Sequence, residues 1–519
     1  MKLVKIEQEK VRIKTNEKEF QQVRLNDLIS VSDGEVELVT MVTAITEEDG
    51  NDPITEEIFL KDLEQLSLKL VECSILGSVI DGSFQQQIDK YPSTEVQIER
   101  ITENYFGSMM VDLRGKSGFL IGNYTSYDFP AYIDGNKFYQ RHSCMVGNTG
   151  CGKSETVAKI MEETANQTNC NMIVFDIHGE YGALSYVDNI EIGVNVPFPS
   201  WFLGFQSLVT NVLKVKEEST ILMSALRKAF YKQNPKGNEN KPCYFDFYKA
   251  LKYIQELDTE CVGTGEIYQS GAKKGEEKKV KGDYNGKLSS LVNTMETLFS
   301  DKRYEFLFIE EEQEALKEFV NRIMGGEKPV KNIDLSHVPH EIAVLVIGAI
   351  TKLVYHIQTM QKKARPITLV CDEAHVYIPT DFQLSASQRR MVEIFENIAK
   401  EGRKFGITLF VASQRPSELN KTIMAQCANY IVMKLNNEND KSMIKGMMPA
   451  GSSEVIETTT MFSPGDCFVI GDACPIPLKI HVELAKERPQ SKTIPFWEEW
   501  KKEKKKIDYK TCLEEYLKR

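Results

Sequence analysis

Gly147-Asn148-Thr149-Gly150-Cys151-Gly152-Lys153-Ser154 is the stretch of sequence that decides the fold. It matches the pattern G-x-x-x-x-G-K-[ST], and its context fits: the apolar residues Cys144-Met145-Val146 precede it, and a helix-compatible run follows from Ser154 to Thr164. In such a phosphate-binding loop (P-loop), glycines allow backbone N–H groups to surround an anion at the positive end of a helix. We therefore predict that Gly147–Ser154 binds ATP, that Lys153 reaches the β and γ phosphates, and that Ser154 holds Mg²⁺.

Two acidic residues, Asp372 and Glu373, follow the apolar run Pro366–Cys371. This run predicts a buried strand, which places both carboxylates at the carboxyl edge of the sheet, where open α/β folds bind their ligands. Asp372 can then take part in the Mg²⁺ sphere, while Glu373 points elsewhere and can orient and deprotonate a water for attack on the γ-phosphate. The pair favours an ATP hydrolase over a small-molecule kinase or a GTPase switch.

Two further residues are candidates for contact with the γ-phosphate. The apolar run Ile407–Ala412 predicts a strand that delivers Gln414 to the same sheet edge, as a sensor of the γ-phosphate or the attacking water. Arg403 follows a helix-like segment, Ser385–Glu401. It either complements the dipole of that helix or reaches a neighbouring chain's nucleotide as an arginine finger, and the residues alone leave both interpretations open.

The four residues Asp372-Glu373-Ala374-His375 have the sequence of a motif that defines one helicase superfamily. The arginine-rich Q-x-x-G-R-x-G-R stretch that belongs with that motif is not found in this sequence. We therefore interpret the match as a coincidence, and we expect His375 to pack or hydrogen-bond rather than to catalyse.

The composition is that of an ordinary globular protein, with 519 residues of which 41% are hydrophobic. The net charge of -11 neither supports nor excludes nucleic acid, which would have to meet a local basic feature. The eleven cysteines have no paired C-x-x-C spacing, so free thiols and no structural metal are expected. The N-terminus lacks a signal core and the longest apolar run, Ile342–Ile350, is about half of what a bilayer requires, so we predict a soluble, cytoplasmic protein without membrane contact.

The region from about residue 10 to 136 has short alternating or β-branched runs such as Glu35–Ile45 and Cys73–Ile80, separated by turn signals. This pattern predicts a small β-rich domain, interpreted as a barrel, with a helix-like stretch, Glu56–Leu70, inserted in it. From Phe138 onward, apolar strands alternate with helices, which is typical of a mostly parallel α/β sheet. The strands predicted there are Ser143–Val146, Met172–Asp176, Ile367–Cys371, Ile407–Ala412, Tyr430–Leu435 and Asp466–Ile470.

Between the second and third of these strands lies a long helical segment with a lysine-rich, glycine-punctuated stretch, Gly271–Gly286, which reads most simply as a solvated mobile loop. The lysine-rich C-terminal tail resembles an exposed helix or arm. The predicted fold class is therefore α/β: a RecA-like P-loop ATPase core with a mostly parallel sheet, plus an N-terminal β-barrel domain and a helical insertion. We predict a barrel-like domain over residues 1–136, the ATPase core over 137–196 and 327–485, the insertion over 197–326, and a C-terminal arm over 486–519.

Several motifs together resemble the HerA branch of the HerA–FtsK superfamily. They are Arg141-His142 before the P-loop strand, the run Asp176-Ile177-His178-Gly179-Glu180-Tyr181, the segment Trp201–Leu208, the acidic pair, and Glu401–Ile407 followed by Ala412-Ser413-Gln414-Arg415-Pro416. The likeness is strongest over 107–182 and 366–445, and it is absent over the 210–330 region. That absence puts any transfer of pore-loop residues in doubt.

The resemblance implies a homo-hexameric ring that hydrolyses ATP with Mg²⁺ between its subunits and moves double-stranded DNA through a central pore with a partner nuclease. It implies that Lys153 and Ser154 bind nucleotide and Mg²⁺, that Glu373 activates water and that Gln414 senses the γ-phosphate. By the same resemblance, Arg403 becomes the favoured finger in trans, and Arg141 stands where the family has an arginine bracing the neighbouring subunit's site.

Two hypotheses of different classes remain open at this point. The first is a DNA-translocating motor. The second is an ATP-dependent ring scaffold that organises an effector, because bacterial members of the family also occur with nuclease or NAD-consuming partners in anti-phage systems. A conjugation or secretion coupling ATPase is weakened by the absence of predicted membrane spans.

Overall fold

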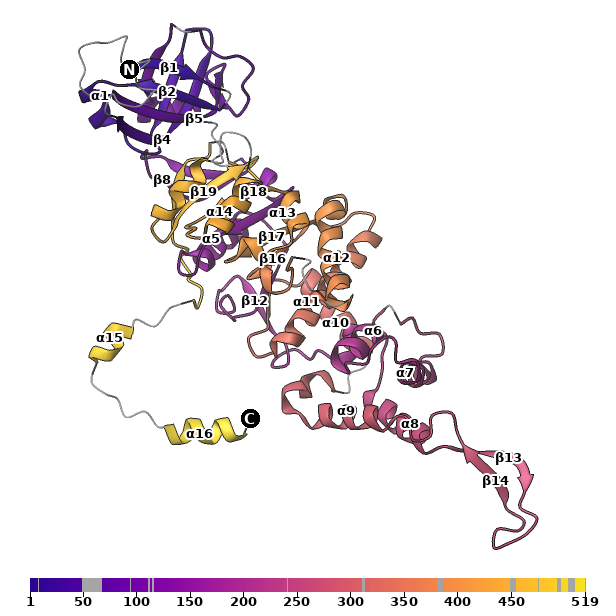
Figure 1. The fold of residues 1–519 in the computed structure, drawn as a ribbon. Helices are drawn as coiled ribbons and strands as arrows, with labels where there is room; N and C mark the ends of the chain where they lie inside the picture. The colour runs from indigo at the N-terminus through magenta and orange to yellow at the C-terminus, as the bar shows by residue number, and fades with distance from the viewer. Residues whose placement is uncertain are drawn as a thin grey trace.

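A computed structural model describes residues 1–7, 9–48, 68–93, 95–110, 113, 116–239, 241–309, 313–380, 384, 386–448, 454–474, 476–491, 496–502 and 509–518. The chain is elongated, with the N-terminal sheet at one end, a larger sheet in the middle and a helical segment at the other end (Figure 1). The ATPase motifs of the sequence all belong to the larger sheet.

The N-terminal sheet has seven strands in the order β1-β2-β5-β4-β3-β7, with β6 paired to β5. All of its pairs are antiparallel, and its interior is lined by buried aliphatic residues such as Val11, Ile29 and Val71. The strands are β1 Lys2–Ile6, β2 Lys10–Lys14, β3 Leu28–Ser32, β4 Glu37–Glu48, β5 Leu68–Ile80, β6 Ser83–Gln85 and β7 Gln97–Arg100, accompanied by helices α1 Glu17–Gln22 and α3 Glu103–Met109. The pairings of the described residues do not join β1 to β7, so closure into a barrel stays a prediction. The predicted helix over 56–70 lies outside the described residues except for its last three, which begin β5.

The larger sheet has eleven strands in the order β12-β15-β11-β16-β17-β10-β18-β19-β20-β8-β9. From β12 to β18 every neighbouring pair is parallel, and from β18 to β9 every pair is antiparallel, so the sheet is mixed. The strands are β8 Gly118–Tyr124, β9 Pro130–Asp134, β10 His142–Val146, β11 Met172–Asp176, β12 Val187–Glu191, β15 Val330–Asp334, β16 Ile367–Cys371, β17 Ile407–Ser413, β18 Cys427–Val432, β19 Asp466–Gly471 and β20 Lys479–Val482.

The six strands predicted for this sheet are all present, with β11 and β16 at the predicted bounds. The predicted start of the ATPase core at residue 137 differs from the pairing, because β8 and β9 lie in the larger sheet beyond β20. Glycine makes this edge possible: a Cβ at Gly122 would lie 2.0 Å from the carbonyl oxygen of His481 on β20. The larger sheet therefore begins at Gly118.

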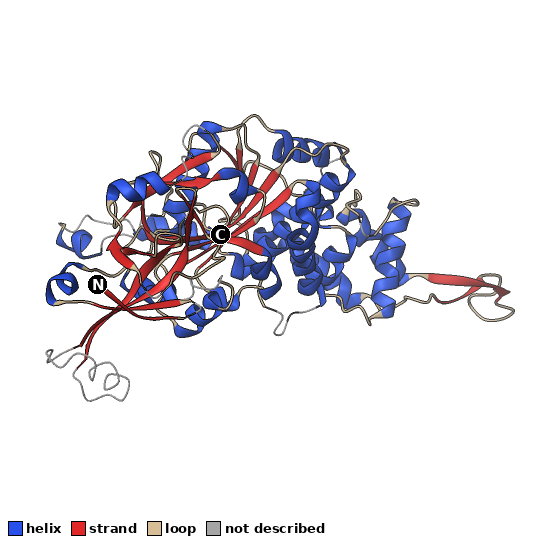
Figure 2. Cartoon of the chain, turned by 90° about the horizontal axis from the view of Figure 1, so that it is seen from above, coloured by secondary structure: helices blue, strands red, loops and turns tan. Residues whose placement is uncertain are grey.

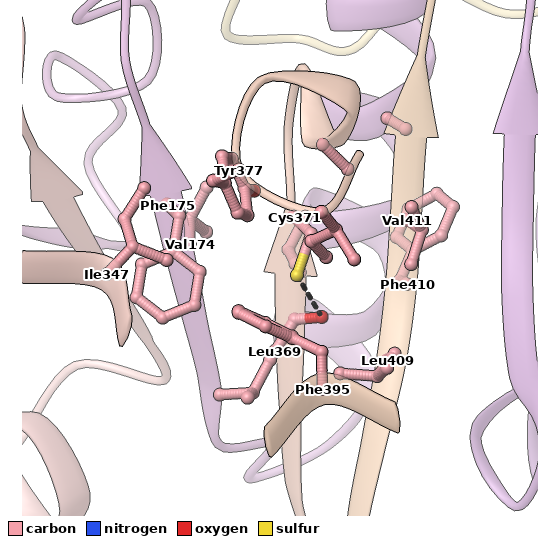
Figure 3. Close-up of a cluster of buried hydrophobic side chains, with 14 of the residues drawn as sticks. Val174, Phe175, Ile347, Leu369, Cys371, Tyr377, Phe395, Leu409, Phe410 and Val411 are labelled. Atoms are coloured by element: carbon pink, nitrogen blue, oxygen red, sulfur yellow. Dashed lines mark hydrogen bonds between the residues drawn. The ribbon is translucent and has the colours of Figure 1, made fainter. Parts of the chain in front are cut away.

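Helices cover the larger sheet and fill the segments between its strands. They are α4 Gly135–Tyr139, α5 Lys153–Gln167, α11 His340–Met360, η4 Ala374–Val376, α12 Ala386–Glu401, η5 Gly402–Phe405, η6 Pro416–Glu418, α13 Lys421–Gln426, α14 Glu438–Lys445 and η7 Glu454–Met461. Figure 3 shows the core where Ile347 of α11 and Phe395 of α12 meet the side chains of β11, β16 and β17, with Tyr377 at the upper end. This packing fixes the strands whose carboxyl ends carry the predicted site.

Helix α11 extends the apolar run that looked too short to cross a membrane. With 21 residues and a mean hydropathy of 1.6 over its most apolar window, α11 has the length and composition of a membrane span. Half of that window is buried inside the protein, and α11 packs against α12. A core helix of a soluble protein passes the same test, so these properties alone are weak evidence for a span.

The segment between β12 and β15 is mainly helical, and between two of its helices it carries a hairpin that projects beyond them (Figure 2). Its elements are η1 Ser200–Leu203, α6 Phe205–Ser207, the π-helical turn η2 Leu208–Val212, α7 Thr220–Gln233, α8 Phe247–Thr259, β13 Cys261–Ile267, β14 Glu277–Lys281, α9 Ser289–Ser300, η3 Lys302–Leu307 and α10 Gln313–Gly325. The lysine-rich stretch predicted as a loop instead supplies β14, which pairs antiparallel with β13. The C-terminal arm carries two exposed helices, α15 Phe496–Lys501 and α16 Tyr509–Lys518, which stand apart from the body in Figure 1.

Candidate active site

Four neighbouring parallel strands bring the predicted residues to one edge of the larger sheet. In the order β11-β16-β17-β10, these strands end at Asp176, Cys371, Ser413 and Val146. Cys371 is aligned with Phe175 on one side and Val411 on the other, and Val146 is aligned with Ser413. The residues that follow each strand are therefore neighbours, as expected for the carboxyl edge of an open α/β sheet.

The P-loop has the backbone that its glycines predict. Gly150 and Gly152 have φ angles of 76° and 101°, which side chains rarely adopt. Gly152 caps α5 without a side-chain hydrogen bond, so the first N–H groups of the helix face the loop. The buried Lys153 turns back on its own loop, and its Nζ donates to the carbonyl oxygens of Gly147 (3.0 Å) and Asn148 (3.3 Å). An entering phosphate would offer this ammonium a stronger, charged acceptor.

Asp372 is buried and held by two donors. The backbone N–H of Glu373 donates to its Oδ1 at 2.9 Å, and the hydroxyl of Tyr181 donates to its Oδ2 at 2.8 Å. Burial raises the pKa of Asp372 to about 7, and the neighbouring Glu373 carboxylate adds to the rise. A bound divalent cation would oppose both effects, because it favours the ionised form of the carboxyl group.

Glu373 is buried in a strained backbone conformation. Its φ of 44° lies in the left-handed region, which costs a non-glycine residue about 1–3 kcal/mol and is typical of functional sites. Among the residues that the structure describes, none hydrogen-bonds its Oε2, although His375 Nδ1 lies 3.4 Å away. Burial lowers the pKa of His375, so the ring is a weak ion-pair partner. A buried carboxylate oxygen without a protein donor can accept a hydrogen bond from a water.

Gln414 connects the P-loop to the acidic pair. The Thr149 hydroxyl donates to Gln414 Oε1, and Gln414 Nε2 donates to Glu373 Oε1. The adjacent Ser413 hydroxyl hydrogen-bonds His375 Nδ1 at 3.2 Å. The structure thus brings Gln414 to the position that its prediction as a sensor requires, and it gives His375 the hydrogen-bonding surroundings that were expected.

Arg141 and Arg403 lie together, away from the P-loop edge. Both line a cavity of about 510 Å³ that also involves Lys137, Asp134 and Asp472. Arg141 Nη2 lies 3.7 Å from Asp472 Oδ2, and Arg403 lies on η5 directly after α12. Two arginines predicted to act on a nucleotide therefore share one surface, which is not the surface that holds this chain's own P-loop.

The family model of the HerA helicase central domain matches residues 119–354. A DNA double-strand break repair helicase HerA of Sulfurisphaera tokodaii is 25% identical over 446 residues, which are 83% of this chain and 81% of that protein. A probable helicase of Methanocaldococcus jannaschii is 23% identical over 92% of this chain and 90% of its own length. The chain is a HerA-like ATPase.

Two solved structures can be compared with this HerA-like ATPase at lower sequence identity. VirB4 of Thermoanaerobacter pseudethanolicus aligns with a TM-score of 0.48 at 13% identity, covering 74% of this chain and 99% of VirB4. The bacterial conjugative coupling protein TrwB aligns with a TM-score of 0.43 at 12% identity, covering 69% and 88%. At these scores, neither likeness bears on function.

The donor set of the HerA-like site fits Mg²⁺. Asp372 and the Ser154 hydroxyl are hard oxygen ligands, and each oxygen of Asp372 accepts one hydrogen bond in the structure, which leaves a lone pair on each. Among the described residues, no group of three or more His, Cys, Asp or Glu side chains could hold a metal alone. Mg²⁺ is usually bound through one or two carboxylates together with the substrate phosphates.

Two tyrosines that contact Asp372 were not predicted as site residues. Tyr181 belongs to the 176–181 run that carried the family resemblance, and Tyr377 donates to the main-chain oxygen of Asp372 at 3.0 Å. Both side chains are fully buried. From sequence alone, a tyrosine among apolar residues is predicted to be a core residue. Only the folded structure shows which group its hydroxyl contacts.

Glu373→Gln is expected to keep ATP and Mg²⁺ bound while hydrolysis falls by about a hundredfold or more, since an amide cannot accept a proton from water. Equilibrium binding of a fluorescent ATP analogue and steady-state phosphate release measure the two effects. The matched control is Glu418→Gln, an exposed acid that pairs with Arg415. Loss of ATP binding in Glu373→Gln would assign Glu373 to the structure of the site or to its metal.

Proposed function

We propose that this HerA-like ATPase is a homo-hexameric ring motor that uses ATP and Mg²⁺ to translocate or unwind double-stranded DNA, together with a partner nuclease or effector. One observation supports a ring assembly. The hydrolytic residues lie together at one sheet edge, whereas Arg141 and Arg403 line a separate cavity. In a ring of identical chains every contact is head to tail, so residues on one face complete a site on the opposite face of the neighbour.

Within one chain, the proposed roles follow from the contacts. The P-loop amides and Lys153 bind the phosphates, and Ser154 and Asp372 hold Mg²⁺. Glu373 orients and deprotonates the attacking water, and one oxygen of its buried carboxylate has no hydrogen-bond partner among the described residues. Gln414 lies between Glu373 and Thr149, where a γ-phosphate would compete for its amide. Phosphoryl transfer of this kind depends mainly on positioning and on neutralising charge.

Between chains, we propose that Arg403 contributes charge to the neighbour's γ-phosphate and that Arg141 braces the same site. The weak contact to Asp472 leaves the Arg141 guanidinium half-exposed. An arginine presented in trans makes hydrolysis depend on assembly, because neither chain has a complete site alone.

The DNA part of the proposal is supported by the named function of the relatives, among them the repair helicase of Sulfurisphaera tokodaii. We propose that the N-terminal sheet, the helical segment over 197–326 and the arm over 486–519 are accessory units around the ATPase core. A net charge of -11 places DNA contacts on local basic features rather than on the whole surface.

ATP turnover of the purified chain is expected to rise with double-stranded DNA and to lose this stimulation as salt increases, because phosphate contacts release counterions. Phosphate release is measured with and without DNA, alone and with a candidate nuclease or NAD-consuming effector. Lys153→Ala serves as the inactive control. A rate that ignores DNA at every salt concentration but changes with the effector would favour an ATP-dependent scaffold over a motor.

A further inference from the structure

We propose that Tyr181 is a positioning residue that holds the Asp372 carboxylate in the orientation needed for Mg²⁺. This inference rests on the metal role proposed for Asp372. Tyr181 follows strand β11, whereas Asp372 follows strand β16, 191 positions away in the sequence. The proposal therefore adds a residue from a second strand end to those that take part in ATP hydrolysis.

Tyr181 is itself fixed from two sides. Its backbone N–H donates to Asp176 Oδ2 at 3.0 Å, while Asp176 Oδ1 accepts from the N–H groups of His178 (3.2 Å) and Gly179 (2.8 Å). Asn332 on β15 donates to Asp176 Oδ2 as well, at 3.0 Å. The fully buried Asp176 thus folds the turn after β11 so that the Tyr181 ring lies beside β16.

At the other end of the side chain, the Tyr181 hydroxyl donates to Asp372 Oδ2 at 2.8 Å. The N–H of Glu373 holds Oδ1, so the two donors fix the rotation of the carboxylate plane. Groups that hydrogen-bond a metal ligand orient it, and their loss typically costs about 10- to 100-fold in metal affinity or activity. The geometry therefore assigns Tyr181 a part in metal binding without direct contact to the metal.

The simpler alternative is that the Tyr181 hydroxyl is only a buried donor that has found an acceptor. Tyr377 provides a comparison within the same site, because it is also 0% exposed and also donates to Asp372. Its acceptor is the main-chain oxygen, at 3.0 Å, and not the carboxylate. Loss of either hydroxyl removes buried hydrogen bonding, which at Tyr377 includes a bond with the Cys371 thiol, but of the two only the loss at Tyr181 frees the carboxylate.

The test compares Tyr181→Phe with Tyr377→Phe in the full chain. Binding of a fluorescent ATP analogue is measured during a Mg²⁺ titration and in EDTA, and thermal unfolding is recorded for each variant. Tyr181→Phe is expected to raise the half-saturating Mg²⁺ concentration by about 10- to 100-fold while leaving nucleotide affinity in EDTA unchanged. Tyr377→Phe is expected to lower the melting temperature by a similar amount and to leave the Mg²⁺ requirement unchanged.

Equal Mg²⁺ requirements in wild type and Tyr181→Phe would overturn the proposal, as would equal increases in the two tyrosine variants. If Tyr181→Phe does not fold, Asp176→Asn is used, since it loosens the hold on the Tyr181 N–H at constant volume. A raised Mg²⁺ requirement in that variant supports the proposal, and an unchanged one rejects it.

Asp372→Asn separates this inference from the proposed function. If Asp372→Asn itself leaves the Mg²⁺ requirement unchanged, the metal assignment fails and the role of Tyr181 fails with it. If Asp372→Asn raises the requirement and Tyr181→Phe does not, only the role of Tyr181 is rejected. With both roles correct, adding Tyr181→Phe to Asp372→Asn raises the requirement no further, because the two residues act as a unit.

Discussion

Lys153→Ala is expected to abolish ATP turnover, because it removes the P-loop ammonium that reaches the β and γ phosphates. In the structure this ammonium lies inside the loop, where it donates to the carbonyl oxygens of Gly147 and Asn148. Phosphate release and binding of a fluorescent ATP analogue measure the effect.

Lys159→Ala is the matched control for this variant. Lys159 is a second buried lysine on α5, and it pairs with Glu163 at 2.9 Å and Glu483 at 3.4 Å, outside the loop. Its loss should reduce stability and leave the phosphate site intact. Turnover near that of the wild type in Lys153→Ala would remove the P-loop from the mechanism.

Arg403→Ala is expected to assemble and to bind ATP, yet to lose about a thousandfold or more in turnover, as finger arginines do in other phosphoryl-transfer enzymes. The reason is that its charge would stabilise the transition state in the neighbouring subunit's site. Lys404→Ala, an exposed cation of the same short helix η5, is the matched control. Oligomeric state by native mass spectrometry and turnover by phosphate release are measured together.

Mixing separates a trans arginine from a cis arginine. Arg403→Ala and Lys153→Ala subunits, each inactive alone, should recover some hydrolysis at junctions where an intact P-loop meets an intact arginine. No recovery in rings shown to be mixed would contradict the shared site and leave the ATPase assignment intact.

A site residue could be predicted from the sequence where one short segment contains both a recognisable secondary-structure pattern and the functional side chain. The P-loop and the strand before Asp372 were predicted at their observed places, because an apolar run followed by glycines or acids has few other structures. Gln414 was also predicted correctly at the sheet edge. Its hydrogen bonds to Thr149 and Glu373 join three separate segments, and no local pattern contains them.

Strands could not be predicted from the sequence where their polar residues are buried or where the whole strand is exposed. Strand β15 is buried along its whole length but contains Lys331 and Asn332, so it lacks the apolar run of a central strand. Some of its polar groups have partners far away in the sequence: Lys331 Nζ donates to Asn171 Oδ1 at 2.7 Å, and Asn332 Nδ2 donates to Asp176 Oδ2 at 3.0 Å. Burial lowers the pKa of Lys331 to about 8. In the reverse case, the hairpin β13–β14 is almost wholly exposed, so its sequence has the composition of a loop.

The order of strands in the larger sheet also sets when the ATP site can form during synthesis. On β10, Cys144 is aligned with Val411 of β17 and Tyr430 of β18, so both neighbours of the P-loop strand come from the last quarter of the chain. Until residue 432 has left the ribosome, β10 is an open edge that can pair wrongly. The N-terminal sheet, in contrast, pairs only within the first 100 residues. A growing chain therefore completes its N-terminal unit early and its catalytic loop near the end of translation.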